Sequence, residues 1–171
     1  MGELAFIAED LGVITADVVE LLESLDLPGM RVLQYGFDGG WDNPHRLQNH
    51  PERAMVVTGT HDNDTIVGWW RGVDDVVRHR VRDAAASWGI HEDEPHRALI
   101  RLAFSSRAGL AVIPVQDVLG LGSEGRLNTP GTVNGNWGWR LEDGRLTDEL
   151  ADWLRHVTET AARRPAPPGG H

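Results

Sequence analysis

The sequence predicts an α/β fold. Short apolar runs that suit buried strands alternate with longer segments in which apolar residues recur at helical spacing. Acidic residues directly follow two of the apolar runs, in Ala8-Glu9-Asp10 and in His61-Asp62-Asn63-Asp64. Charged side chains at the ends of buried strands are costly unless they are paired or functional. The pattern therefore indicates an acidic cleft suited to a neutral, hydroxyl-rich ligand such as a sugar.

Four apolar runs predict strands. Their boundaries are Leu4–Ile7, Arg31–Phe37, Ala54–Val57 and Leu110–Val115. A loop rich in glycine, asparagine, proline and histidine is expected from Asp38 to about Pro51. A second long loop, rich in glycine and asparagine, is expected over Gln116–Asn136.

Helical segments separate these runs. After the first run, Thr15 is a suitable N-cap, and Pro28-Gly29 ends the helix. The apolar residues between them follow the i, i+3, i+4, i+7 spacing of an amphipathic helix: Val18, Leu21, Leu22 and Leu25. Further helices are expected at about Asp74–Ser87, from Glu94-Pro95 to about Phe104, and after a Thr147 cap. Residues 163–171, with three prolines and two glycines, are expected to form a disordered tail.

Composition excludes several classes of protein. The 171 residues suit about one domain, and the net charge of −10 argues against a nucleic-acid partner. No apolar run approaches the roughly 20 residues of a membrane helix, so no membrane partner is expected. The absence of cysteine and of a basic leader favours a reducing cytoplasm. No phosphate loop, dinucleotide fingerprint or Gly-x-Ser-x-Gly motif is present, so no cofactor is expected.

Glu9 and Asp62 are the main catalytic candidates from position alone. Glu9 follows an apolar run, where burial would raise the pKa of its carboxyl toward that of a general acid. The same position also suits a carboxylate that caps a helix or forms an ion pair. Asp10 either holds a substrate hydroxyl or caps the helix at Thr15. Asp62 occupies the equivalent place after the third run, with His61 beside it.

Three further side chains are candidates for ligand binding. His61 would hydrogen-bond a sugar hydroxyl or orient a carboxylate, although a lone histidine is usually structural. Asp38 and Asn128 lie in loops, where such residues more often form turns. The Asp62–Asp64 segment lacks the glycine and distal glutamate of a calcium loop, and His61 lacks partners at zinc-ligand spacing. No metal site is therefore expected.

The order of elements resembles part of a larger α/β barrel. Candidate site residues follow the strands, which is where a TIM barrel places its active site. A closed barrel of that type needs eight strands, and only four are predicted here.

Four motifs, in this order, resemble the 4-α-glucanotransferases (amylomaltases, or disproportionating enzymes) of glycoside hydrolase family 77. They are Ile7-Ala8-Glu9-Asp10-Leu11-Gly12-Val13-Ile14-Thr15, Leu27-Pro28-Gly29-Met30-Arg31-Val32-Leu33-Gln34, Thr58-Gly59-Thr60-His61-Asp62-Asn63-Asp64-Thr65, and Gln116-Asp117-Val118-Leu119-Gly120-Leu121-Gly122-Ser123-Glu124 running into Asn128-Thr129-Pro130-Gly131-Thr132. The resemblance implies the C-terminal half of a (β/α)8 TIM barrel, strands five to eight, with residues 1–162 as a partial catalytic domain.

The resemblance also implies roles for individual residues. Glu9 would be the general acid/base after the fifth strand, and Asp62 the transition-state-stabilising carboxylate after the seventh. His61, Asp10, Asp38 and Asn128 would contact the glucan. The implied reaction transfers a segment of a 1,4-α-glucan to the 4-position of glucose or another glucan, with retention of configuration. The implied partners are maltodextrin, a glucose acceptor and the remainder of the barrel.

One feature of the family is missing. Its nucleophile is an aspartate in an Arg-x-Asp-His motif that precedes the Glu9 motif, and no segment of this sequence matches that motif. We therefore expect this chain alone to be inactive. A non-catalytic maltodextrin-binding remnant and an α-glucan hydrolase of the same clan are the alternatives.

Overall fold

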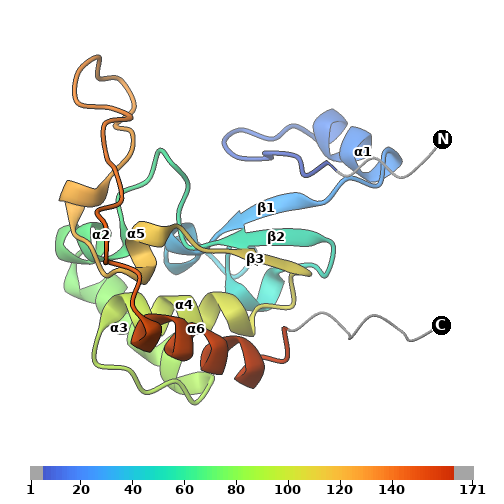
Figure 1. The fold of residues 1–171 in the computed structure, drawn as a ribbon. Coiled ribbons are helices and arrows are strands. Elements are labelled where there is room, and N and C mark those ends of the chain that lie inside the picture. The colour runs from blue at the N-terminus through green and yellow to red at the C-terminus, as the bar shows by residue number, and fades with distance from the viewer. Residues whose placement is uncertain (1–5, 164–171) are drawn as a thin grey trace, which may run out of the picture.

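The computed structural model describes residues 6–163 (Figure 1). Three parallel strands form one sheet in the order β1-β2-β3. The strands and α-helices are α1 (Ala16–Ser24), β1 (Gly29–Val32), β2 (Ala54–Val57), α2 (Ile66–Gly72), α3 (Asp75–Ser87), α4 (Pro95–Ser105), β3 (Leu110–Val112), α5 (Val115–Val118) and α6 (Asp148–Thr160). Short 3₁₀ helices are η1 (Leu33–Phe37), η2 (Leu47–Asn49) and η3 (Ser123–Gly125). The α/β fold class is confirmed.

The sheet is short and in strict parallel register. Gly29 pairs with Ala54 and Val32 with Val57, while Met55 pairs with Leu110. Parallel strands need crossover connections, and in this chain the connection from β2 to β3 runs through α2, α3 and α4. The carboxyl ends of β2 and β3 therefore lie at the same edge, where the loops that follow them meet.

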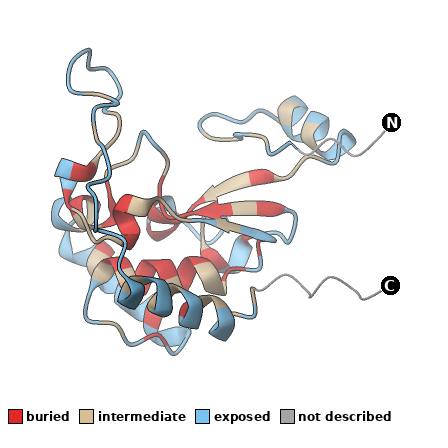
Figure 2. Cartoon of the chain, viewed as in Figure 1, coloured by how far each residue is buried: buried red, intermediate tan, exposed pale blue. Residues whose placement is uncertain are grey.

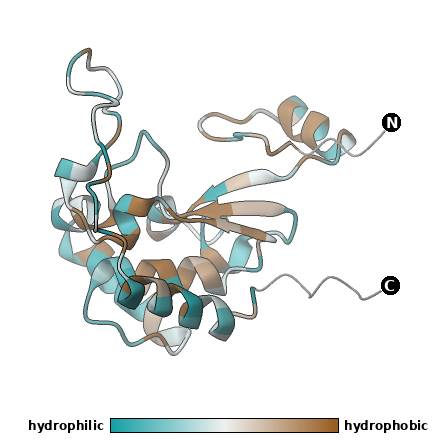
Figure 3. Ribbon diagram, in the orientation of Figure 1, coloured by the Kyte–Doolittle hydropathy of each residue, from teal (hydrophilic) through white to brown (hydrophobic). Residues whose placement is uncertain are grey.

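The core lies between the sheet and the helices on one of its sides (Figure 1). Helix α4 contributes most, with Leu99, Ile100, Leu102 and Ala103 fully buried. Val56 of β2 and Ile66 of α2 are equally buried, and they join the same cluster. Figure 2 shows this buried layer along α4 and the strands, and Figure 3 shows that its residues are apolar.

Two predicted strands end earlier than expected. The second was expected over Arg31–Phe37, but β1 ends at Val32 and residues 33–37 form η1. This tight turn buries Leu33 and Phe37, and Gly36 packs against the carbonyl of His45, where an added Cβ would lie 2.2 Å from the oxygen. The fourth was expected over Leu110–Val115, but β3 ends at Val112.

A proline accounts for the second difference. Pro114 cannot donate to a strand ladder, and in this position it is the N-cap of α5. Helix α5 begins at Val115, the last residue of the expected strand, and overlaps the start of the expected long loop, within which η3 lies. Helix α2 was also not expected; Thr65 caps it by accepting a hydrogen bond from the Gly68 N–H.

Most other boundaries are confirmed, but the first helix was expected to continue to Pro28-Gly29, whereas α1 ends at Ser24 and Gly29 begins β1. The third strand matches Ala54–Val57 residue for residue. The helices expected from Thr15, Asp74, Glu94 and Thr147 all form, and Asp74 and Thr147 cap theirs through side-chain oxygens. Thr15 occupies the N-cap position of α1 without a side-chain capping bond.

The ends of the chain bear on two further expectations. Half of the expected Leu4–Ile7 strand lies outside the described residues, and Phe6 and Ile7 are exposed and not in a strand. The Ala8 N–H donates to the Pro28 carbonyl (2.9 Å), which is too little pairing for a ladder. Residues 164–171 of the expected tail also lie outside the described range. Among residues 6–163, no helix is long and apolar enough to cross a membrane.

Candidate active site

The loop that carries His61 and Asp62 connects the end of β2 to α2. A single buried carboxylate, that of Asp117 in α5, holds both ends of this loop. Thr58 Oγ1 donates to Asp117 Oδ2 (2.5 Å), and the Ile66 N–H donates to Asp117 Oδ1 (2.7 Å). Burial raises the pKa of the Asp117 carboxyl, and the two hydrogen bonds oppose that shift. Asp117 therefore fixes the loop without reaching its exposed tip.

Asp62 stands at the centre of a polar cluster. Asn128 Nδ2 donates to Asp62 Oδ1 (2.5 Å), and His61 Nε2 lies 3.3 Å from the same oxygen. The side chains of His61 and Asp62 are 44% and 47% exposed, so solvent or a ligand can reach both. Among the described residues, Asp62 Oδ2 has no hydrogen-bond partner. It is therefore free to accept a hydrogen bond from a hydroxyl group of a ligand. The structure thus brings three of the predicted site residues together.

A second loop, which follows η3, completes this cluster. Arg126 Nη2 donates to the Asp62 carbonyl (2.7 Å), and Arg126 Nε donates to the Asn128 carbonyl (2.8 Å). The Asn128 N–H donates to the His61 carbonyl (3.1 Å). The backbone of each loop is therefore held by the other, although Asp62 and Asn128 are 66 residues apart.

The end of β1 is tied to the same loop. Asn63 Nδ2 donates to the Tyr35 hydroxyl (2.9 Å), and Gln34 Nε2 donates to the Asp64 carbonyl (2.9 Å). Asn63 Oδ1 also accepts from the Thr60 N–H (2.8 Å). These contacts use residues of η1, so the early end of β1 gives the loop a third support.

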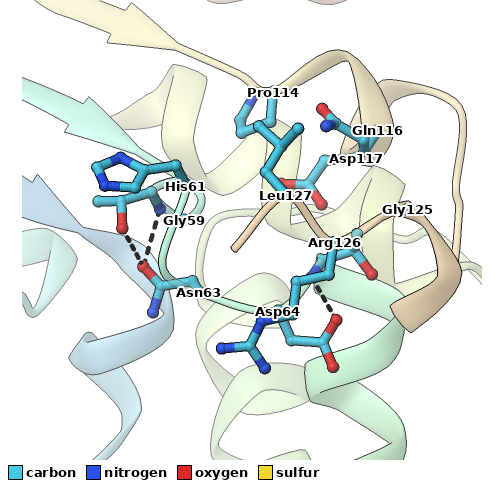
Figure 4. A pocket seen from close by; sticks show the side chains of 12 residues that line it. Gly59, His61, Asn63, Asp64, Pro114, Gln116, Asp117, Gly125, Arg126 and Leu127 are labelled. Atoms are coloured by element: carbon cyan, nitrogen blue, oxygen red, sulfur yellow. Dashed lines mark hydrogen bonds between the residues drawn. The ribbon is translucent and has the colours of Figure 1, made fainter. Parts of the chain in front are cut away.

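A cavity of ≈ 80 Å³ adjoins the cluster at His61. Its walls come from the loop after β2 and from the segments after β3, including His61, Asp64, Asp117 and Leu127 (Figure 4). A cavity of this size is far below the several hundred Å³ of a typical ligand pocket. The face formed by His61, Asp62 and Asn128 is open, and a ligand can reach it without entering the cavity.

Glu9 and Asp10 lie on a different part of the molecule. Asp10 Oδ1 accepts from the Met30 N–H (2.5 Å), and Asp10 Oδ2 accepts from Arg31 Nη1 (2.9 Å), so its carboxylate joins this segment to β1. Glu9 itself is exposed, so the burial expected from its place after an apolar run is wrong for the described structure. No contact joins Glu9 to Asp62 within the described structure.

Asp38 also lies outside the cluster. It is exposed and follows η1, where its carbonyl accepts a hydrogen bond from Asn43 Nδ2 (2.7 Å). The same amide nitrogen donates to the Tyr35 carbonyl (2.8 Å). These bonds shape a turn, which is the role such loop residues usually have. Its contact with a ligand stays a prediction.

Sequence reasoning missed several residues that build the site. Arg126 and Tyr35 give no local signal, because their importance comes from contacts across long sequence separations. Asp117 did offer a signal, since it follows the fourth apolar run in the way that Glu9 and Asp62 follow theirs. Within residues 6–163, no group of three histidine, aspartate or glutamate side chains is arranged to hold a metal ion.

Comparison of the sequence with known proteins identifies its family. A family model described as 4-alpha-glucanotransferase, glycoside hydrolase family 77, matches residues 1–147. The chloroplastic/amyloplastic 4-alpha-glucanotransferase of Arabidopsis thaliana is 51% identical over 166 residues, which are 95% of this chain and 28% of that protein. The 4-alpha-glucanotransferase of Thermus thermophilus is 48% identical, over 95% of this chain and 33% of that protein.

A solved structure gives the same result for the fold. The amylomaltase from Streptococcus agalactiae in complex with acarbose superposes with a TM-score of 0.89 at 28% identity. The match covers 95% of this chain and 33% of that one, so the chain spans about a third of the length of its relatives. The match of the family model over most of the sequence is decisive, and the chain belongs to the 4-alpha-glucanotransferase family.

Proposed function

We propose that this chain forms part of the active site of a 4-α-glucanotransferase. The observation that carries the proposal is the cluster of Asp62, His61 and Asn128 at the carboxyl end of β2. An exposed carboxylate that accepts a hydrogen bond from Asn128 and lies beside His61, with its second oxygen accessible, suits the recognition of sugar hydroxyls. The names of the relatives from Arabidopsis thaliana and Thermus thermophilus support this substrate class.

The proposed reaction divides its steps among several carboxylates. A nucleophilic carboxylate attacks the anomeric carbon while Glu9 gives a proton to the departing glycosidic oxygen. The 4-hydroxyl of an acceptor glucan then attacks the covalent intermediate, and Glu9 takes the proton of that hydroxyl. Asp62 stabilises the charged transition state, and His61 and Asn128 orient the sugar. Asp10 and Asp38 are assigned to the glucan-binding surface.

The sequence supplies no candidate for the nucleophile, because it holds no Arg-x-Asp-His motif. We propose that the chain corresponds to strands five to eight of a (β/α)8 barrel, and that its partner is the remainder of that barrel. The 171 residues alone would then not complete the two-step reaction. A cytoplasmic location remains a prediction, since the Arabidopsis thaliana relative is described as chloroplastic/amyloplastic.

A graft into a complete relative tests these assignments. The segment of the Thermus thermophilus enzyme that matches this chain is replaced by residues 1–171, and the disproportionation of maltotriose is followed by product analysis. We expect the graft to form longer glucans. Glu9→Gln should lower kcat by about 10²–10⁴-fold and Asp62→Asn by about 10²–10³-fold. Asp143→Asn, in an exposed loop, is the matched control and should have little effect.

The products separate the alternatives. Reducing ends without longer glucans would indicate hydrolysis, and the transferase proposal would fail. A graft that folds, binds maltodextrin and forms no product would favour the binding remnant. Full activity in Asp62→Asn would contradict the role proposed for that carboxylate, whichever reaction is observed. Turnover of maltotriose by the ungrafted chain would contradict its proposed inactivity.

A further inference from the structure

The indole of Trp137 lies against the candidate active site. Its ring centroid is 5.3 Å from that of His61, and the two ring planes are inclined by 34°. His61 in turn contacts Asp62, so the aromatic surface is continuous with the polar cluster. Trp137 is 56% exposed, which leaves part of its ring open to solvent.

Trp137 has an unfavourable backbone conformation, which hydrogen bonds of its own backbone hold in place. Trp137 has a φ of 61°, in the left-handed region that bulky residues rarely adopt. Its N–H donates to the Leu127 carbonyl (2.7 Å), and its own carbonyl accepts from Arg140 Nη1 (2.9 Å). Strained residues of this kind persist where the surroundings fix them, and they gather at functional sites.

The loop from Asn128 to Trp137 is closed by its own side chains. Asn136 Oδ1 accepts from the Thr129 N–H (3.0 Å), and Asn136 Nδ2 donates to the Thr132 carbonyl (3.0 Å). One end of the loop places the Asn128 amide on Asp62, and the other end places the indole on His61. A single closed loop therefore presents a hydrogen-bonding group and an aromatic ring to the same site.

Other tryptophans show what a structural role looks like in this chain. Trp69, Trp70 and Trp153 are partly buried and pack against the core. Trp139, only two residues from Trp137, lines a cavity beside α5 and η3 together with Leu119 and Glu124. Trp137 differs from these in two ways. Its ring contacts His61, which lies beside the catalytic candidate Asp62, and more than half of the residue is exposed.

We propose that Trp137 is a substrate-binding residue that stacks on a pyranose ring of the α-glucan, next to the ring held by His61 and Asp62. The C–H faces of a pyranose are apolar, and an aromatic ring buries them while the hydroxyl edges remain available to polar groups. His61, Asp62 and Asn128 provide those polar groups within reach of the same loop. The inference rests on the proposed glucan-binding function and assigns it an aromatic subsite.

The test uses the 171-residue chain, labelled with ¹⁵N at its tryptophan indoles, and maltoheptaose as the probe. Each of the seven tryptophans contributes one indole N–H signal, and the signal that is lost in Trp137→Phe is that of Trp137. We expect the Trp137 signal to shift on titration while the Trp139 signal stays in place. Trp137→Ala should raise the Kd about tenfold. Trp137→Phe should raise it less, because a ring remains, and Trp139→Ala should change it less than twofold.

The outcomes separate this inference from the proposed function. If Asp62→Asn weakens binding but the Trp137 signal is unmoved and Trp137→Phe and Trp137→Ala bind as the wild type does, the aromatic subsite is wrong and the glucan site stands. If no signal of the wild-type chain responds to maltoheptaose, the aromatic subsite is wrong for this chain, while the product analysis of the graft still decides the proposed function. Should Trp137→Ala not fold, the shift of the wild-type signal and the affinity of Trp137→Phe still decide the question.

Discussion

Helices α1 and α4 have similar amphipathic sequences, but α4 is buried in the core and α1 is exposed. Both are amphipathic, with apolar residues along one side. Helix α4 buries six residues, whereas α1 buries none. In α1, Leu21 is 55% exposed; Leu25, which follows the helix, is 56% exposed. Figure 3 shows apolar residues along α1, and Figure 2 shows the same helix as exposed or intermediate.

The difference teaches that an amphipathic pattern specifies a helix and an apolar face but does not supply what covers that face. The arm formed by residues 6–28 is attached to the rest of the molecule mainly through polar groups. Asp10 binds Met30 and Arg31, and Arg53 Nε pairs with Asp26 at 2.8 Å. The remainder of a barrel, our proposed partner, would account for the exposed apolar residues of the arm.

The largest expected effect on stability comes from truncating a buried side chain of α4. Leu99→Ala removes a fully buried side chain of α4 and should lower the free energy of unfolding by about 2–5 kcal/mol. Leu21→Ala makes the same chemical change on α1 and should alter it by about 0.5 kcal/mol or less. Urea denaturation followed by tryptophan fluorescence measures both. Equal losses would show that α1 is packed in solution, and the comparison of the two helices would fail.

Acid should weaken the body of the fold through His50, which lies before β2. Its Nδ1 lies 2.7 Å from Ser106 Oγ and its Nε2 lies 3.0 Å from the His45 carbonyl. Burial lowers the pKa of His50 from 6.5 to about 4. Because the folded-state pKa is lowered, the unfolded chain takes up the proton first. The stabilisation is therefore fully present above pH 6.5 and is lost as the pH falls through about 4.

His50→Gln isolates this effect. Over that pH range, the wild type should lose up to about 3 kcal/mol of unfolding free energy that the variant does not lose. The pKa of His45 is also lowered by burial, so the difference between the two proteins is the informative quantity. Urea titrations at pH 7, 5.5 and 4 provide it. Parallel pH profiles would show that His50 does not titrate in this way.

The sequence predicted the elements better than their ends. Val56 and Val57 lie in a run whose neighbours are polar or glycine, so β2 has clear limits at both sides. In the run Arg31–Phe37, Gln34 and Gly36 alternate with apolar residues, as polar residues often do in a strand, so the pattern does not mark the end of β1. The second half forms η1, where Gly36 packs against the carbonyl of His45. Pro114 is visible in the sequence, and a strand that ends before it would finish at Ile113, within one residue of the observed end of β3.

In the candidate site, too, the local sequence pattern predicted some residues, whereas the roles of others depend on the tertiary structure. The pattern of an acid after an apolar strand found Asp62, and it also marks Asp117, which is buried and holds the loop. Burial, which is not visible in the local pattern, distinguishes the two. The meeting of Asn128 with Asp62 depends on the crossover through α2–α4, so spacing alone did not predict that contact. The resemblance to family 77 supplied the assignment of Asn128.

The smallest expected effect concerns the attachment of the arm. Asp10→Ala removes the acceptor of the Met30 N–H and the ion pair with Arg31, both partly buried. The free energy of global unfolding should fall by about 1 kcal/mol or less, since the arm adds little to the core. Amide exchange in α1 should accelerate about tenfold, because the arm opens locally.

Asp26→Asn is the matched control within the same arm. Its ion pair with Arg53 is exposed, with side-chain exposures of 75% and 63%, and exposed pairs contribute little. Asparagine also tolerates the φ of 51° at this position, so the substitution adds no backbone strain. Hydrogen exchange of α1 should therefore be nearly unchanged. If Asp26→Asn releases α1 as much as Asp10→Ala does, the partly buried carboxylate of Asp10 is not the main attachment of the arm.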